Sequence, residues 1–336
     1  MKKVLTLAIV ALLALTLTAC NSDDGTITIG ANIYTYNDNF MNGVVRPELE
    51  RYAEEKGVEL DMVDSEGDQA KLNDQVDVFI DKGVDVLAIN LVDPAAAGNI
   101  IEKAKDAGIP LILFNKEATE AGIMDTYDKV WYVGTDSAEA GIIQGEMMVA
   151  DWQANAAWDL NEDGIVQYVL LKGEPGHPDA EARTLESVKA FTDAGIQVEE
   201  LALAASPTWS TADAKNTMDA WLTSAFSTDI ELVICNNDGM SFGAVNSMQA
   251  ASFDLPVYGV DALDQALTMI GDGELNGTVL NDGVNQARAT IDLAINAANG
   301  DDIVAGTDWV IDSATGTKAV RVAYVAVTAD NYSDFQ

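Results

Sequence analysis

The sequence is poor in cysteine and in positive charge, and these two shortages exclude certain folds and certain binding partners. Cys20 and Cys235 are the two cysteines in 336 residues, which leaves no basis for a disulfide framework. Lys and Arg together number 18 against 55 Asp and Glu, and the formal net charge is −37. A surface of this sign repels the phosphates of nucleic acids and of anionic membranes, so neither is expected as a partner.

Gly-rich phosphate loops, long apolar runs and flexible linkers are also missing. No motif of the P-loop or dinucleotide-binding type occurs, which disfavours a kinase or a dehydrogenase. After the first residues, no apolar run reaches the length needed to span a bilayer. No Pro-rich or Gly/Ser-rich segment divides the chain. Short crossovers that act as a hinge are therefore expected between its domains.

The first residues have the pattern of an export signal. Lys2 and Lys3 precede an apolar stretch, residues 4–17, that is too short to span a bilayer comfortably. The following Leu-Thr-Ala-Cys20 resembles the lipobox of bacterial lipoproteins, in which the cysteine becomes the lipidated first residue. Residues 1–19 are then a signal and 20–24 a tether, with the protein in the periplasm or anchored through Cys20 at the outer face of the cell membrane. An ordinary secretory signal near a cysteine is the alternative.

Between residues 26 and 281, short β-rich runs alternate with longer amphipathic ones. Two successive sets of such units predict an α/β protein with two doubly wound parallel-sheet domains. Cys235 falls inside one of the apolar runs and is expected to be a small buried hydrophobe. The predicted strands cover 26–33, 59–63, 84–90, 109–115, 130–133, 165–171, 197–203, 230–235 and 256–260.

Polar or turn-forming residues follow most of these predicted strands. In open parallel sheets, ligands bind at the carboxyl ends of the strands, where loops and helix N-termini bring polar groups together. Two such sheets that face each other would hold a ligand in the cleft between them. The residues in question are Ser65, Asn90, Asn115, Thr135, Gly173, Asn236, Asn237, Asp261 and Asn281.

An acidic loop at residues 159–167 has part of a calcium-binding pattern. It places oxygen-bearing side chains at positions 1, 3, 5 and 9, with Gly164 at position 6 for a sharp turn. This is the first part of an EF-hand-type loop. Position 12, where an EF-hand has a bidentate Glu, is Leu170. From these residues alone, a calcium site and an Asx-rich turn both remain open.

Several segments together resemble the family of periplasmic galactose/glucose-binding proteins. The resemblance covers essentially the whole chain after the signal, and the run Leu171-Lys-Gly-Glu-Pro-Gly-His-Pro-Asp-Ala-Glu-Ala-Arg183 is highly specific. Inside one segment Thr35 and Asn37 stand where Lys and Asp are usual, which puts the fine sugar preference in doubt. The other matching segments are 33–40, 88–98, 236–238, 259–263 and 277–282.

The resemblance implies a periplasmic binding protein-like type I fold, with two domains joined by three crossovers. Such a protein closes on one D-glucose or D-galactose and delivers it to the permease of an ABC importer, and some members also signal to a chemoreceptor. The amino-terminal domain would comprise 25–134 plus 282–321, and the carboxyl-terminal domain 135–281 plus 322–336. The chain is expected to act as a monomer and not as an enzyme.

The resemblance also assigns the sugar contacts. Phe40 and Trp209 match two aromatic residues that sandwich the pyranose, whose C–H faces suit aromatic rings. The polar partners would supply charge-assisted and amide hydrogen bonds to the hydroxyls. Without the resemblance, Asp179 and Arg183 would be interpreted as a surface pair four residues apart at a helix start. The polar set is Asp38, Asn90, His177, Asp179, Arg183, Asn237, Asp261 and Asn281.

For the acidic loop, the resemblance implies that a bidentate carboxylate comes from another strand, at Glu231. A structural Ca²⁺ would then pin the carboxyl-terminal domain without touching the sugar. Its predicted ligands are Asp159, Asn161, Asp163, the carbonyl of Ile165, Gln167 and Glu231.

The sequence also bears on three other functions. A glycosidase-like enzyme needs two suitably spaced acids with divided protonation roles, whereas here the acids alternate with Asn, Arg and His. A binding protein for a different monosaccharide also remains open. A transcription regulator of the same fold would need a basic DNA-binding segment, which this acidic chain lacks.

Overall fold

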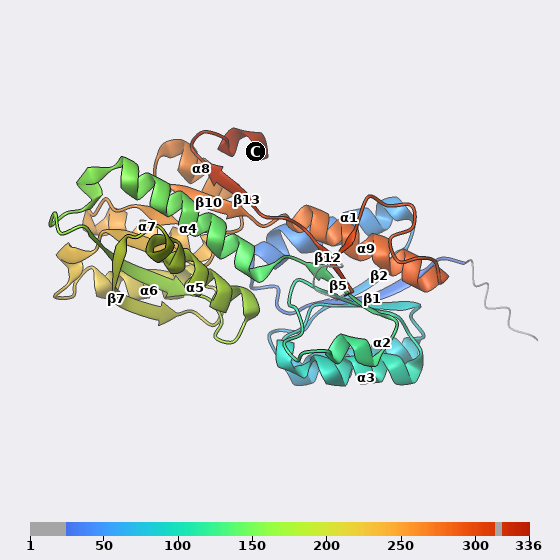
Figure 1. Ribbon diagram of the computed structural model, residues 1–336. Helices are drawn as coiled ribbons and strands as arrows, with labels where there is room; N and C mark the ends of the chain where they lie inside the picture. The colour runs from blue at the N-terminus through green and yellow to red at the C-terminus, as the bar shows by residue number, and fades with distance from the viewer. Residues whose placement is uncertain (1–24, 313–317) are drawn as a thin grey trace, which may run out of the picture.

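The computed structural model describes residues 25–312 and 318–336. It shows two α/β lobes side by side, joined by extended segments (Figure 1). The predicted signal, the tether and Cys20 lie outside the described residues. Within the part described, no helix combines the length and apolar character needed to cross a membrane.

The amino-terminal domain is built on a seven-stranded sheet with the order β11-β12-β5-β4-β3-β1-β2. All neighbouring strands are parallel except β11 and β12. Helices α1 (Arg46–Lys56) and α9 (Gly283–Asn299) cover one face, and α2 (Gln69–Lys82) and α3 (Ala97–Ala107) cover the other (Figure 1). The strands are β1 (Thr28–Ile33), β2 (Glu59–Asp64), β3 (Val86–Ile89), β4 (Leu111–Phe114), β5 (Val130–Gly134), β11 (Ile311–Asp312) and β12 (Ala319–Arg321).

The carboxyl-terminal domain is built on a six-stranded sheet with the order β13-β10-β9-β8-β6-β7, in which β13 is antiparallel to β10. Helices α4 (Ser137–Ala154) and α5 (Pro178–Asp193) pack together, as do α6 (Thr211–Trp221) and α7 (Asp238–Ala251), and α8 is Asp264–Asp272. The strands are β6 (Ile165–Lys172), β7 (Gln197–Ala205), β8 (Leu232–Cys235), β9 (Val257–Tyr258), β10 (Gly277–Leu280) and β13 (Val325–Thr328).

Local sequence explains where these elements begin and end. Helix α2 starts after Asp68, whose carboxylate accepts hydrogen bonds from the N–H groups of Ala70 and Lys71. It ends at Gly83, which has a left-handed φ of 73° that glycine adopts at no steric cost. Cys235 is buried at the end of β8, as predicted. The antiparallel strands β11 and β13 were not expected from the alternation of strands and helices.

The chain passes between the two sheets three times. It leaves the amino-terminal domain through residues 135–136, returns through 281–282, and passes over again through 322–324. The first and third crossovers touch, since Val322 N donates to Gly134 O at 2.7 Å. Arg321 adds a hydrogen bond to Thr135 O and a bidentate pair with Glu117 at 2.7 and 2.8 Å. The predicted fold class, two α/β domains joined by three crossovers, is confirmed.

Candidate functional site

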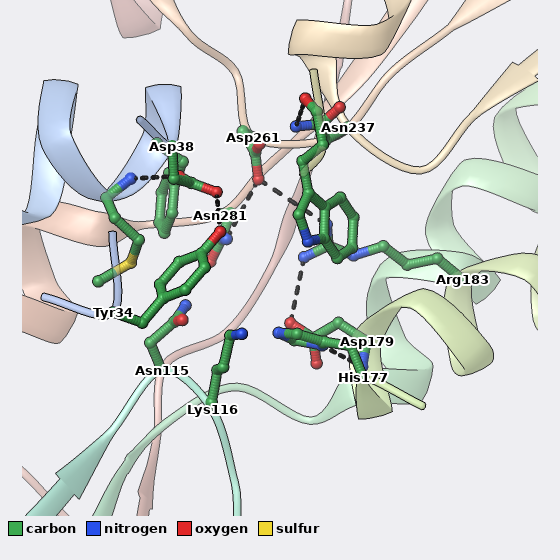
Figure 2. A pocket seen from close by; sticks show the side chains of 13 residues that line it. Tyr34, Asp38, Asn115, Lys116, His177, Asp179, Arg183, Asn237, Asp261 and Asn281 are labelled. Carbon is green, nitrogen blue, oxygen red and sulfur yellow. Dashed lines mark hydrogen bonds and ion pairs between the residues drawn. The ribbon is translucent and has the colours of Figure 1, made fainter. Parts of the chain in front are cut away.

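A cavity lies between the two domains and is lined by residues of both. The amino-terminal domain contributes the segment after β1 and two residues after β4. The carboxyl-terminal domain contributes helix α5 and the loops after β6, β7, β8 and β9, and Asn281 follows β10. All of these loops are at carboxyl ends of parallel strands, as expected. The lining residues are Tyr34, Asp38, Phe40, Met41, Asn115, Lys116, His177, Asp179, Arg183, Trp209, Asn237, Asp261 and Asn281 (Figure 2).

Every predicted sugar contact except Asn90 lines this cavity. Asn90 is fully buried behind it, where its Oδ1 accepts from Tyr34 N at 2.9 Å. Its Nδ2 donates to Phe114 O at 3.2 Å and reaches Asn115 Oδ1 at 3.3 Å. Asn90 therefore positions two lining residues, Tyr34 and Asn115, and does not itself face the cavity.

The sequence-based set omitted four lining residues: Tyr34, Met41, Asn115 and Lys116. Asn115 carried a signal, because it is among the polar residues that follow a predicted strand. Tyr34 donates its hydroxyl to Asp38 Oδ2 at 2.7 Å, and Met41 N donates to the other oxygen of Asp38 at 2.7 Å. The carboxylate of Asp38 is thereby fixed in orientation on one side of the cavity (Figure 2).

Both predicted aromatic residues are buried and each ring lies against a glycine. A Cβ on Gly173 would meet the ring of Trp209 at 2.2 Å, and a Cβ on Gly283 would meet the ring of Phe40 at 2.9 Å. Any larger residue at Gly173 would displace the indole, because real Cβ contacts do not reach that distance. Glycine is thus what allows these rings to sit directly on the backbone beside the cavity.

His177 is held in its neutral form. Its Nδ1 accepts from Asp179 N at 3.1 Å, which caps helix α5. Burial lowers the pKa of His177 to about 3, and the nearby charges of Lys116 and Arg183 lower it further while Asp179 opposes the change. Because Nδ1 is the acceptor, the single ring proton is on Nε2, where it is available as a donor.

Arg183 is the central cation of the carboxyl-terminal side (Figure 2). It is 3% exposed, and its Nη1 donates to Asn236 O at 2.9 Å while its Nη2 lies 3.3 Å from Asp179 Oδ2. Nη1 is also 3.9 Å from Asp261 Oδ1. Its Nε–H is buried and has no hydrogen-bond partner in the part of the chain that the structure describes. An unpaired buried donor costs free energy, so Arg183 occupies this position at the expense of one hydrogen bond.

The backbone is strained at three lining residues. Asn115, Trp209 and Asp261 have φ values of 61°, 55° and 128°, which residues other than glycine rarely adopt. Asp261 is also buried, and burial raises the pKa of its carboxyl while the charge of Arg183 lowers it. Strained backbone collects at ligand-binding sites because it aims side chains that a relaxed turn would not place there.

A family model described as a periplasmic binding protein domain matches residues 29–302. The chain belongs to this periplasmic binding protein family. The D-galactose/methyl-galactoside binding periplasmic protein MglB of Haemophilus influenzae is 48% identical over 308 residues, which cover 91% of this chain and 91% of that protein. The ribose import binding protein RbsB of Bacillus subtilis is 27% identical over 279 residues, covering 83% of this chain and 82% of that protein.

Solved structures agree with this membership. An ABC transporter solute binding protein from Bacillus halodurans with bound myo-inositol superposes with a TM-score of 0.76 at 27% identity, covering 94% of this chain and 98% of that one. The predicted type I fold of the periplasmic binding proteins is thereby confirmed.

The acidic loop of this periplasmic binding protein folds back on its own N–H groups. Asp159 accepts from Asp163 N and Gly164 N at 3.0 and 2.8 Å, and Glu231 accepts from Leu160 N and Gln167 N at 2.6 and 3.0 Å. No three His, Cys, Asp or Glu side chains within residues 25–312 and 318–336 are arranged to hold a metal ion by themselves.

The loop nevertheless retains features that fit a hard cation. Gln167 Oε1 is buried without a hydrogen-bond partner among the residues described. Burial raises the pKa of Glu231, and the negative charges of Asp159 and Asp163 raise it further. All the predicted ligand atoms are oxygens, the type that Ca²⁺ prefers. Asn161 and the Ile165 carbonyl, which belong to the predicted set, would have to complete such a site.

Proposed function

We propose that this protein captures D-galactose or D-glucose between its domains and delivers it to the permease of an ABC importer. The observation that carries the proposal is that Arg183, a buried guanidinium, lines a cavity together with the aromatic rings of Phe40 and Trp209. A ligand with acceptor oxygens and apolar C–H faces would satisfy both features, and a hexose has both. The name of the 48% identical relative, which specifies D-galactose and methyl-galactoside, supports this ligand class.

The cavity would hold such a sugar from both domains at once. Asp38 and Asn115 come from one domain, and His177, Arg183 and Asn237 come from the other. Contacts to both sides are complete only when the domains are closed, so the sugar would shift the equilibrium towards the closed form by its differential affinity. The permease, and any chemoreceptor that responds to the same sugar, would then recognise the closed surface.

Binding without turnover is supported by how the carboxylates are used. Asp38 accepts hydrogen bonds from Tyr34 and Met41, and Asp179 accepts from Ser137 Oγ at 2.6 Å. A glycosidase needs one carboxyl free to give a proton and another that acts as nucleophile or base. Carboxylates fixed by several donors are better suited to orienting hydroxyls.

Calorimetric titration with a panel of hexoses and pentoses tests this function directly. We expect saturable binding of galactose or glucose, with quenching of tryptophan fluorescence and no new product in the mixture. Release of sugar from a galactoside during incubation would favour the enzyme instead. Absence of binding to every member of the panel would refute the proposal.

We also propose that the acidic loop binds one structural Ca²⁺ and that Cys20 anchors the exported protein to a membrane. The buried, unpaired Gln167 Oε1 supports the first part. For the second part the support is the lipobox-like sequence that ends at Cys20. Loss of membrane association in a Cys20→Ser variant would be the expected result of removing the anchor, whereas unchanged fractionation would contradict it.

A further inference from the structure

Tyr324 lies in the third crossover, between β12 and β13, where the chain passes from one lobe to the other (Figure 1). Its side chain is buried, with 4% exposure. Its hydroxyl oxygen accepts from Arg183 Nη2 at 3.0 Å and lies 3.0 Å from Thr135 Oγ1 in the first crossover. One hydroxyl thus connects a residue that lines the cavity with two of the three crossovers.

The direction of these hydrogen bonds follows from the chemistry of the groups. A guanidinium can only donate, so the oxygen of Tyr324 is the acceptor from Arg183. The hydrogen of the same hydroxyl is then free to be donated to Thr135. Burial raises the pKa of Tyr324, which keeps the hydroxyl protonated. A phenol is therefore suited to this position in a way that a phenylalanine of the same shape is not.

A second connection runs parallel to the first. Ser137, at the start of α4 directly after the first crossover, donates its hydroxyl to Asp179 at 2.6 Å. Asp179 in turn lies 3.3 Å from Arg183 Nη2. In addition, Tyr324 N donates to Glu139 Oε2 at 3.2 Å, and this hydrogen bond connects the third crossover with the first turn of α4. The orientation of Arg183 is therefore fixed by groups at the crossovers as well as by its own domain.

We propose that Tyr324 is a positioning residue that makes the sugar contact of Arg183 dependent on the arrangement of the first and third crossovers. The inference rests on the proposed sugar-binding function. Tyr324 and Thr135 lie where the third and first crossovers enter the domain that holds Arg183, so a rearrangement there would change the acceptor that Tyr324 offers to Arg183. By linkage, a ligand that engages Arg183 favours the crossover arrangement in which Tyr324 contacts both partners.

The test is a Tyr324→Phe variant, which keeps the ring and removes the hydroxyl. Loss of one hydrogen bond to a charged group should raise the Kd for the sugar about tenfold or more. The matched control is Tyr168→Phe, which removes a hydroxyl in the same domain that contacts Glu200 at 3.2 Å. The control should bind the sugar with the wild-type Kd. Calorimetry gives the Kd, and thermal unfolding of the sugar-free proteins gives their stability.

A second variant tests whether the two hydroxyls act through one connection, while unchanged thermal stability of the sugar-free variants separates positioning from a purely structural role. Thr135→Val alone should weaken binding, and the double variant should lose less affinity than the sum of the single losses, because both act on one connection. Additive losses, or a Tyr324→Phe variant with wild-type affinity, would overturn the inference. If wild-type protein bound no sugar of the panel, the proposed function would fail instead, so the two failures are distinguishable.

Discussion

Lys116 Nζ lies 2.7 Å from Glu174 Oε2, and this ion pair joins the two domains beside the cavity. The lysine is 1% exposed, and its Nζ is 3.8 Å from the centre of the Tyr34 ring. Burial lowers the pKa of Lys116, and the carboxylate of Glu174 opposes that change. A buried amine whose carboxylate partner belongs to the other domain is stable only while the domains are together. The pair is therefore a feature of the closed form.

Removing this partner should weaken closure. In Glu174→Gln, the buried Lys116 keeps a polar neighbour and loses the opposite charge, so we expect the sugar Kd to rise about fivefold, or about 1 kcal/mol. The control is Glu181→Gln, which alters the ion pair of Glu181 with Lys172 within one domain. Small-angle scattering should show that more sugar is needed to compact the Glu174 variant. Equal sugar dependence in both variants would contradict the assignment.

Gly173 should be intolerant of a side chain because the Trp209 ring occupies the space. We expect Gly173→Ala to displace the indole, to destabilise the fold by about 1 to 3 kcal/mol and to weaken sugar binding. Gly43→Ala is the matched control, since a Cβ there meets no atom within 4 Å. Thermal unfolding and fluorescence titration measure the two effects. Wild-type fluorescence quenching by sugar in Gly173→Ala would show that the ring position is not required.

Substitution of Asn115 should weaken sugar binding with little change in stability, whereas substitution of Asn90 should mainly lower stability. Asn115→Gly removes the amide without strain at its positive φ, so stability should change little while the Kd rises about fivefold to tenfold. Asn90→Ala leaves the buried Tyr34 N–H without its acceptor, which should lower the unfolding free energy by about 1 to 3 kcal/mol. Urea unfolding beside calorimetric titration separates the two roles. A large loss of stability in Asn115→Gly would contradict the assignment of Asn115 as a sugar contact and not a structural support.

The low pKa of His177 predicts a pH effect on stability. The pKa of His177 falls from 6.5 to about 3 on folding. Between these two pH values, the imidazole is protonated in the unfolded chain and neutral in the folded chain. The stability associated with neutral His177 is therefore complete above pH 6.5 and is lost as the pH falls towards 3. His177→Asn keeps an oxygen able to accept from Asp179 N and removes the titration, so its unfolding free energy should fall less steeply.

Buried carboxyl groups with raised pKa values change the pH dependence of stability in the opposite direction, so their contribution has to be separated from that of His177. Burial raises the pKa of Asp238 from 3.8 to about 6, so its contribution to stability decreases as the pH rises through that interval. Asp238 is present in both proteins, and its contribution cancels in the difference between wild type and His177→Asn. Urea unfolding across acidic to neutral pH gives that difference. Parallel curves for the two proteins would show that His177 does not titrate as described.

Calcium should stabilise the carboxyl-terminal domain without being required for sugar contact. Addition of Ca²⁺ after chelation should raise the Tm, since a ligand bound to the folded form alone stabilises it. Glu231→Gln should reduce this increase, whereas Glu200→Gln, on strand β7 at the edge of the same sheet, should leave it unchanged. An unchanged Tm with and without chelator in wild-type protein would argue against the site.

The sequence by itself determined the local elements and most of the cavity residues. Asp68 and Gly83 delimit helix α2 because a capping carboxylate and a left-handed glycine act within a few residues of the chain. The resemblance through residues 171–183 identified His177, Asp179 and Arg183, which line the cavity. Strand ends with polar residues also indicated correctly at which edge of each sheet the cavity lies.

Tertiary structure alone decided which polar residues face the cavity and which support it. Asn90 and Asn115 both follow buried strands, yet Asn115 lines the cavity whereas Asn90 is fully buried and supports Tyr34 and Asn115 through hydrogen bonds. The Lys116 to Glu174 pair and the hydroxyl of Tyr324 join segments far apart in the chain. No local pattern encodes such contacts, because they depend on how two separately folded sheets meet.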